Sequence, residues 1–143
     1  MIPLKIPAGR VVYLCLMGQV ILVVEDEKTM RDVLVDALSH EGFQVVQAEN
    51  GVQGLSAALN SQPDLIITDI TLPQMSGFQM MVTLREKNEW AQRVPVMYLT
   101  NRTIGNDEER VDIESTAPCA YLVKSDTSLA TIVARAKNCL GVS

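Results

Sequence analysis

The chain has 143 residues, a length typical of one domain, and 48% of them are hydrophobic. Charged residues make up only 20%, which argues against an intrinsically disordered protein. The 17 acidic residues outnumber the 12 basic ones, giving a net charge of −5. Direct binding to nucleic acid is therefore not expected, because affinity for a phosphate backbone depends on clustered Lys and Arg.

The first apolar stretch, at residues 11–24, superficially suggests a membrane anchor or a signal peptide. It is about 14 residues long, whereas a membrane-spanning helix needs about 20. It also runs into the acidic residues 25–27 without a small-residue cleavage site, so we expect no membrane segment. Residues 20–24 predict a buried parallel strand. Residues 1–18 are then expected to be an N-terminal extension, either flexible or upstream of an initiator at Met17, and residues 19–143 the domain.

Apolar residues alternate between strand and helix spacing along the rest of the chain. The helical stripes are followed by the breakers Gly42, Pro63 and Gly141. The pattern predicts strands at residues 20–24, 43–48, 65–67, 94–99 and 120–123, and helices at residues 30–38, 52–59, 78–88, 106–115 and 129–140. Ser125 or Asp126 is the expected N-cap of the last helix.

Strands that alternate with helices and are apolar on both faces indicate a parallel sheet covered on both sides. The predicted fold class is therefore α/β, a doubly wound five-stranded parallel sheet with five helices. In the flavodoxin-like strand order 2-1-3-4-5, the first, third, fourth and fifth strands are neighbours.

The three cysteines, Cys15, Cys119 and Cys139, share no metal-ligand spacing. The single histidine, His40, does not complete a zinc site with them. We interpret the cysteines as small hydrophobic residues kept reduced in a cytosol.

Polar side chains follow four of the predicted strands. They are Glu25 and Asp26 after the first strand, Asp69 after the third, Thr100 at the end of the fourth and Lys124 after the fifth. Ligands in open α/β sheets bind beyond the carboxyl ends of the strands, so we expect these five side chains to converge. One such acid alone is usually a solvated residue or a helix cap, but chance is a poor explanation for all five.

Carboxylates packed together repel one another unless a cation neutralises them. Hard oxygen ligands with open positions suit Mg²⁺, which is often completed by a phosphoryl oxygen. Lys124 and the hydroxyl of Thr100 are suited to bind further phosphoryl oxygens. Asp69 is then a candidate nucleophile, because carboxylates form acyl phosphates.

With these residues identified, the chain resembles the receiver domains of two-component response regulators from about residue 20 to residue 140. The matching segments are Val-Val-Glu-Asp-Glu at residues 23–27, Ile-Ile-Thr-Asp-Ile-Thr-Leu-Pro at residues 66–73, Met-Ser-Gly at residues 75–77, Leu-Thr at residues 99–100 and Tyr-Leu-Val-Lys at residues 121–124. The separations between Asp26, Asp69, Thr100 and Lys124 also agree with that family.

The resemblance implies a role for each matching residue. Asp69 is the implied phosphoacceptor, Lys124 the implied phosphoryl-binding lysine, and Thr100 and Tyr121 the implied switch pair. The implied Mg²⁺ ligands are Glu25, Asp26, Asp69 and the backbone carbonyl of Thr71. The resemblance further implies a cytoplasmic switch that accepts phosphate from a sensor histidine kinase or a phosphotransfer protein and acts on an unknown downstream protein target, without nucleic acid or membrane.

Two residues depart from the family pattern. Ser125 stands where the family usually has a proline, often after a cis peptide bond, so we expect a trans bond here. Asn101 replaces a residue that is commonly small, and we expect it to alter phosphorylation or dephosphorylation rates. The acidic segment at residues 107–114 is interpreted mainly as a solvated helix face, with an acidic output surface as the alternative.

Two other functions remain open at this point. A phosphohydrolase of the haloacid dehalogenase-like class also uses a nucleophilic Asp with Mg²⁺, but its acidic pair lies downstream of that Asp rather than upstream. A phosphorylation-independent, receiver-like binding module is the other alternative. The leading interpretation is a phosphorylation-controlled switch, either a stand-alone receiver or a receiver excised from a longer chain, and not an enzyme acting on other substrates.

Overall fold

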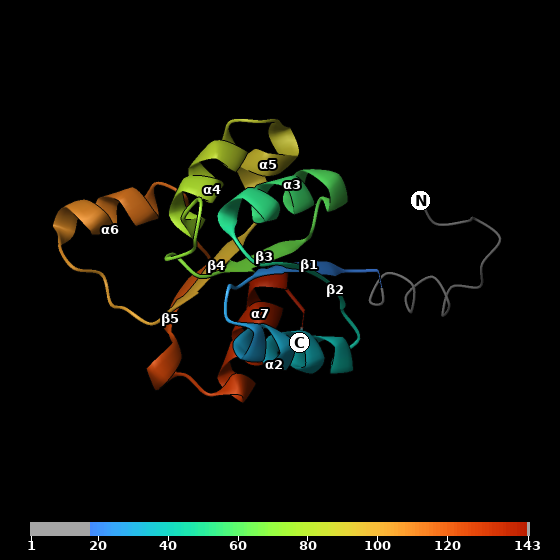
Figure 1. The fold of residues 1–143 in the computed structure, drawn as a ribbon. Coiled ribbons are helices and arrows are strands. Elements are labelled where there is room, and N and C mark those ends of the chain that lie inside the picture. The colour runs from blue at the N-terminus through green and yellow to red at the C-terminus, as the bar shows by residue number, and fades with distance from the viewer. Residues whose placement is uncertain (1–17, 143) are drawn as a thin grey trace.

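The computed structural model describes residues 18–142, which form a five-stranded sheet with six α-helices around it (Figure 1). The predicted extension at residues 1–18, including Met17, lies outside the described residues except for Gly18. The elements in chain order are β1 (Val20–Val24), α2 (Lys28–His40), β2 (Gln44–Ala48), α3 (Gly51–Ser61), β3 (Leu65–Thr68), α4 (Gly77–Arg85), α5 (Glu89–Arg93), β4 (Val96–Thr100), α6 (Asp107–Glu114), β5 (Ala120–Val123), the 3₁₀ turn η1 (Lys124–Asp126) and α7 (Leu129–Leu140).

The sheet is parallel throughout, with the strand order β2-β1-β3-β4-β5, which confirms the predicted topology. Register aligns the carboxyl ends of neighbouring strands. Val24 pairs with Thr68 across β1 and β3, and Thr100 pairs with Val123 across β4 and β5. The loops that follow β1, β3, β4 and β5 therefore leave the sheet at one edge.

Helices cover both faces of the sheet, with α2 and α7 on one side and α3, α4 and α5 on the other (Figure 1). Alternate residues of β1 supply the two cores. Ile21 and Val23 pack with α2 and α7, whereas Leu22 and Val24 pack with α3 and α4. This double burial explains why the strands are continuously apolar. None of the helices within residues 18–142 is long and apolar enough to cross a membrane.

The predicted count of five helices is wrong by one, because an unpredicted short helix, α5, follows the predicted helix at residues 78–88. Helix α4 ends at Arg85, and α5 begins after Asn88. The Asn88 side chain accepts a hydrogen bond from the amide of Ala91 at 2.9 Å and so starts a new helix. In a continuous helix the amide of Ala91 would donate to the backbone carbonyl four residues earlier. Here it donates to the Asn88 side chain instead.

The predicted cap of the last helix is also wrong. Ser125 and Asp126 belong to the 3₁₀ turn η1, and Ser128 is the N-cap of α7. The Ser128 hydroxyl accepts a hydrogen bond from the amide of Thr131 at 3.1 Å. Because Ser125 and Asp126 form the turn that follows β5, the cap lies two or three residues further along the chain than predicted.

The expectation of reduced cysteines is wrong for two of the three. Cys119 and Cys139 form a disulfide, with their Cα atoms 5.8 Å apart. Cys119 directly precedes β5 and Cys139 lies near the end of α7, and packing of that helix on the sheet brings them together. Spacing in the sequence did not reveal this proximity. Cys15 lies outside the described residues.

Candidate functional site

The candidate site is built at the carboxyl edge of the sheet by backbone pairing that continues one residue past the strands. The amide of Glu25 donates to the carbonyl of Ala48 at 3.0 Å, and the amide of Asp69 donates to the carbonyl of Val24 at 3.2 Å. These hydrogen bonds fix the backbone of the two acidic residues directly after the carboxyl ends of β1 and β3. Their side chains consequently start from neighbouring, rigid backbone positions.

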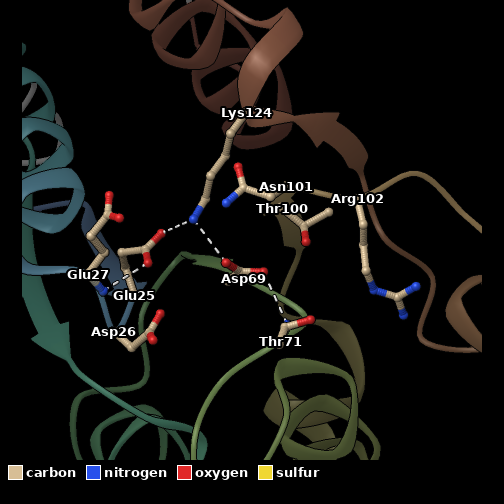
Figure 2. Close-up of a pocket in the computed structure, with 9 residues that line it drawn as sticks. All are labelled: Glu25, Asp26, Glu27, Asp69, Thr71, Thr100, Asn101, Arg102 and Lys124. Atoms are coloured by element: carbon tan, nitrogen blue, oxygen red, sulfur yellow. Dashed lines mark hydrogen bonds and ion pairs between the residues drawn. The ribbon is translucent and has the colours of Figure 1, made fainter.

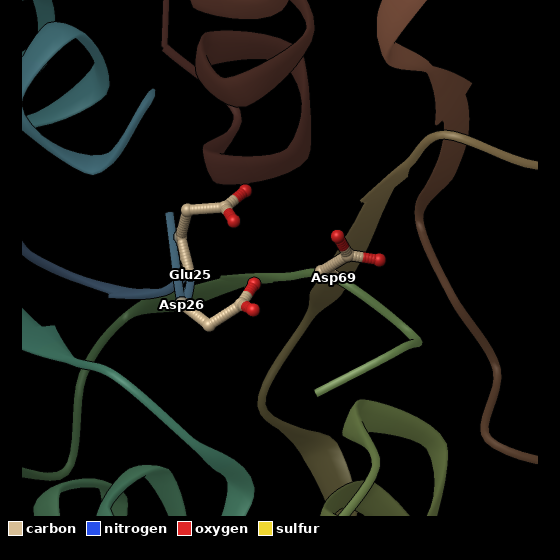
Figure 3. Close-up of side chains that lie close together, drawn as sticks. All are labelled: Glu25, Asp26 and Asp69. Carbon is tan, nitrogen blue, oxygen red and sulfur yellow. The ribbon is translucent and has the colours of Figure 1, made fainter. Parts of the chain in front are cut away.

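Three carboxylates meet there, those of Glu25, Asp26 and Asp69 (Figure 3). Each offers an oxygen atom, and these atoms all lie within 4.8 Å of one another. Glu25 is 2% exposed and Asp69 7% exposed, whereas Asp26 is open to solvent. The predicted convergence of these acids is present in the structure.

Lys124 reaches into this carboxylate cluster from the start of η1 (Figure 2). Its Nζ atom lies 2.5 Å from Oε1 of Glu25 and 2.9 Å from Oδ2 of Asp69. Burial alone lowers the pKa of Lys124, but its hydrogen bonds to Glu25 and Asp69 outweigh that effect and raise the pKa. The ammonium group is therefore held in its charged form. The trans peptide bond before Ser125 does not prevent this reach.

Burial has the opposite consequence for Glu25. It raises the pKa of this carboxyl, although Lys124 and the amide of Glu27 both donate to it and act in the lowering direction. The amide of Glu27 lies 3.1 Å from Oε2 of Glu25. A cation bound among the carboxylates would act against this rise in the pKa of Glu25, because a nearby positive charge favours the ionised form.

The β3–α4 loop holds the second oxygen of Asp69. The amide of Thr71 donates to Oδ1 of Asp69 at 3.1 Å, which leaves the two carboxylate oxygens with different partners. Gly77 closes this loop through a 2.8 Å hydrogen bond from its amide to the carbonyl of Ile70. A Cβ atom on Gly77 would collide with the carbonyl of Asp69, so only glycine fits beside the site.

Thr100 and Tyr121 occupy different positions relative to the cavity. Thr100 is 1% exposed and lines the cavity that holds Asp69 and Lys124. Tyr121 is half-buried, and its hydroxyl donates to the backbone carbonyl of Arg102 at 2.8 Å. Its ring lies 6.3 Å from that of Tyr98. Tyr121 therefore contacts the loop after β4 and does not line the cavity itself.

Two arginines at the site were not identified from the sequence. Arg31, on α2, is 8% exposed and donates to the backbone carbonyl of Glu25 at 2.7 Å. Arg102 lines the cavity and forms an ion pair with Glu109 of α6. Neither arginine ends a strand. The only signal for Arg31 was a charged residue on the inward face of the first helix.

The cavity has a volume of about 330 Å³ and opens at the carboxyl edge of the sheet. Nine residues line it: Glu25, Asp26, Glu27, Asp69, Thr71, Thr100, Asn101, Arg102 and Lys124 (Figure 2). It combines a carboxylate cluster with a lysine and a hydroxyl. Oxygen donors of this kind fit Mg²⁺, and a cation on one side with a lysine on the other suits a small anion such as a phosphoryl group.

Comparison with known proteins agrees with this geometry. The model of the response regulator receiver domain family matches residues 21–134. The chain is 27% identical to the polar-differentiation response regulator DivK of Brucella anthropi, over 87% of this chain and 98% of DivK. It is 38% identical to part of the sensor histidine kinase TmoS of Ectopseudomonas mendocina, over 73% of this chain. That match spans only 10% of the length of TmoS.

The fold also matches solved structures. The chemotaxis response regulator CheY4 of Vibrio cholerae superposes with a TM-score of 0.76 at 24% identity, covering 85% of this chain and 98% of CheY4. At this identity the likeness shows the fold alone.

Proposed function

Because the chain belongs to the response regulator receiver domain family, we propose that it is a phosphorylation-controlled switch that accepts a phosphoryl group on Asp69. One observation carries the proposal: a buried carboxylate at a strand end has one oxygen held by Lys124 and lies within a cluster of two further carboxylates. Aspartate side chains are seldom buried unless they are paired, and Asp69 is 7% exposed and paired with Lys124 inside a cavity, which marks it as the candidate reactive carboxylate.

The transfer is a nucleophilic displacement at phosphorus. An oxygen of Asp69 attacks the phosphoryl group of a phosphohistidine on the donor protein. The new O–P bond forms as the P–N bond breaks, and the freed imidazole nitrogen takes up a proton. The product is an acyl phosphate on Asp69, which water later hydrolyses to return the carboxylate and inorganic phosphate.

Lys124 and Thr100 are the proposed phosphoryl ligands. Lys124 Nζ already lies at hydrogen-bond distance from Asp69, so it neutralises charge on the phosphoryl oxygens without moving far. The buried hydroxyl of Thr100 lines the same cavity and is suited to donate to another oxygen. Asn101 is exposed at the mouth of the cavity, where its amide is proposed to change the rate of hydrolysis.

Glu25, Asp26, Asp69 and the backbone carbonyl of Thr71 are the proposed ligands of Mg²⁺. When bound, the ion supplies electrostatic stabilisation of phosphoryl oxygens. The chain's own contribution is to hold three carboxylates within reach of one another at the ends of β1 and β3. The raised pKa of Glu25 is consistent with a site completed by a cation.

The proposed switch couples Thr100 to Tyr121 through the loop after β4. The hydroxyl of Tyr121 is bonded to the carbonyl of Arg102, two residues after Thr100. Movement of Thr100 toward a phosphoryl group would pull on this loop and release the ring of Tyr121. Helix α6 follows the same loop and buries only Ile113, so few apolar contacts oppose its displacement.

We further propose that residues 19–143 constitute the receiver domain and residues 1–18 an extension. The donor is a sensor histidine kinase or a phosphotransfer protein, and the output is a contact with another protein rather than with nucleic acid or a membrane. The protein acts in the cytoplasm. Under this proposal the chain does not hydrolyse other phosphate compounds, and its chemistry is limited to its own Asp69.

Incubation with Mg²⁺ and acetyl phosphate tests the proposal, with intact mass as the readout. We expect one labile phosphoryl adduct on the wild-type chain and none on Asp69→Asn. Asp36→Asn is the matched control, since Asp36 is an exposed acid on α2 away from the cavity, and it should form the adduct normally.

The other outcomes identify the alternatives. Sustained release of phosphate from phosphate esters would indicate a phosphohydrolase. No adduct on any variant, with both acetyl phosphate and a phosphorylated histidine kinase as donors, would indicate a binding module. An adduct that persists in Asp69→Asn would place the phosphoacceptor elsewhere.

A further inference from the structure

The disulfide between Cys119 and Cys139 has no part in the phosphoryl chemistry proposed for the opposite edge of the sheet. Cys119 directly precedes β5, and Lys124 follows the end of that strand. The bond joins the segment before β5 to the last turn of α7. It therefore closes a covalent loop that contains β5, the η1 turn with Lys124 and most of α7.

We propose that Cys119 and Cys139 are a reversible redox pair, which low-molecular-weight thiols of the glutathione class open and their disulfides close. Proximity is the first argument. The two Cα atoms lie 5.8 Å apart, within the range of ordinary disulfides, so the bond forms and breaks without moving the backbone.

Accessibility is the second argument. Cys119 is exposed and Cys139 is half-buried, so a small thiol reaches the pair from solvent. Thiol–disulfide exchange needs such access, because the attacking thiolate must approach one sulfur in line with the bond. The more exposed Cys119 is the expected point of attack.

Stability of the opened form is the third argument. Without the disulfide, the start of β5 is still held by the amide of Cys119, which donates to the carbonyl of Val96 at 2.8 Å. Helix α7 still buries Ile132 and Ala136 against the sheet, and Lys137 still pairs with Glu41 of α2. A domain of this size does not need a covalent staple to fold. Both redox states are therefore folded.

The exchange balances as a two-electron reaction. A glutathione thiolate attacks the sulfur of Cys119, forming a mixed disulfide, and Cys139 leaves as a thiolate that takes up a proton. A second glutathione attacks the mixed disulfide, releasing Cys119 as a thiol and oxidised glutathione. Closure is the reverse, with oxidised glutathione as the oxidant. In a cytosol, disulfides that form are usually of this transient or sensing kind.

Opening the loop is expected to loosen α7 and leave the central strands unchanged. The closed loop restricts the unfolded chain between residues 119 and 139, so its loss lowers the melting temperature of the domain by several degrees. Amide hydrogen exchange of residues 129–142 should become several-fold faster after reduction, while that of β1 and β3 stays the same.

A redox titration of the full chain tests the proposal. The protein is equilibrated in buffers with different ratios of oxidised to reduced glutathione, quenched with N-ethylmaleimide and analysed by intact mass and peptide mapping. We expect the peptides of Cys119 and Cys139 to change from linked to doubly alkylated within this range. Cys119→Ser and Cys139→Ser should lack the link, and Cys15→Ser should keep it.

Any of three results would overturn the proposal. One is that the bond stays intact in a large excess of reduced glutathione, and another is that both thiols stay free in oxidised glutathione. The third is that Cys15 replaces one partner of the disulfide in the wild-type chain. If the serine variants fail to fold, hydrogen exchange of the reduced wild-type chain provides the second measurement, and global loss of protection would also contradict the proposal. Asp69→Asn should titrate like the wild type, which separates this result from any failure of the proposed phosphorylation.

Discussion

The ammonium nitrogen of Lys124 lies 2.9 Å from Oδ2 of Asp69, although the two residues are 55 positions apart in the sequence. The same nitrogen lies 2.5 Å from Oε1 of Glu25, so one cation joins the ends of β1, β3 and β5. This contact makes the site a single electrostatic unit. Substitution of one member therefore changes the charge balance of the other two.

Lys124→Met should slow formation of the phosphoryl adduct with acetyl phosphate. The variant removes the charged donor beside Asp69, and loss of one such donor costs on the order of 10²–10³-fold in comparable sites. Adduct formation followed by intact mass in the presence of Mg²⁺ is the measurement. Lys137→Met is the control, because Lys137 pairs with Glu41 away from the cavity. Equal rates for the wild type and Lys124→Met would contradict the role proposed for this lysine.

Asp26→Asn should stabilise the protein in the absence of divalent cations. Asp26 adds a third negative charge to the cluster, and Lys124 contacts only the other two carboxylates. Relief of that repulsion is expected to be worth roughly 1 kcal/mol, a rise of a few degrees in melting temperature.

The same variant should lose most of the stabilisation that Mg²⁺ gives the wild type. Thermal melts in EDTA and in millimolar Mg²⁺ measure both effects. Asp36→Asn, an exposed substitution on α2, is the control and should respond to Mg²⁺ as the wild type does. A variant that is less stable in EDTA and still responds fully to Mg²⁺ would count against the metal site.

Stability should fall as the pH rises above 10, and Tyr98 should contribute to this fall. Burial raises the pKa of Tyr98, although its hydrogen bond to Thr116 acts in the lowering direction. Above its unfolded pKa of about 10, the folded protein binds more protons than the unfolded chain. The contribution of Tyr98 is therefore complete below pH 10 and lost as the pH rises through the folded value.

Urea unfolding between pH 8 and pH 11 measures this dependence. Tyr98→Phe should lower the free energy of unfolding by about 1–2 kcal/mol at pH 8, because the 2.7 Å hydrogen bond to Thr116 is lost. Above pH 10 its stability should decline less steeply than that of the wild type. Parallel curves for the two proteins would show that Tyr98 does not titrate with folding.

Ser128→Ala should destabilise the domain by about 1 kcal/mol, because the amide of Thr131 loses its cap. Ser125→Ala is the matched control. The Ser125 side chain lies in η1 and does not cap α7, so this variant should be nearly neutral. Urea denaturation of the two variants side by side measures their free energies of unfolding. A larger decrease for Ser125→Ala than for Ser128→Ala would indicate that Ser125 caps α7, as expected from the sequence.

Local pattern determined most of the architecture. Runs such as residues 20–24 and 65–67 are short, rich in β-branched residues and apolar at every position, which is typical of a strand buried on both faces, and the helical stripes between them have one apolar side. Alternation of the two then implies the parallel sheet. The sequence predicted helix boundaries less accurately where neighbouring polar residues can each act as the N-cap. Asn88 caps a short helix just beyond the predicted one, and Ser128 replaces Ser125 or Asp126 as the cap of α7, because each choice depends on how the neighbouring turn is formed.

The sequence by itself determined the carboxylate cluster, the hydroxyl and the lysine of the site, because Glu25, Asp26, Asp69, Thr100 and Lys124 each follow or end a strand, and parallel strands share one carboxyl edge. Tertiary structure alone decided the contacts made across helices. Arg31 reaches the carbonyl of Glu25 from the inward face of α2, and Cys119 meets Cys139 where α7 packs on the sheet. Residue order specifies the strand ends directly, but these contacts depend on the angle and rotation of a helix, which only packing of the whole core sets.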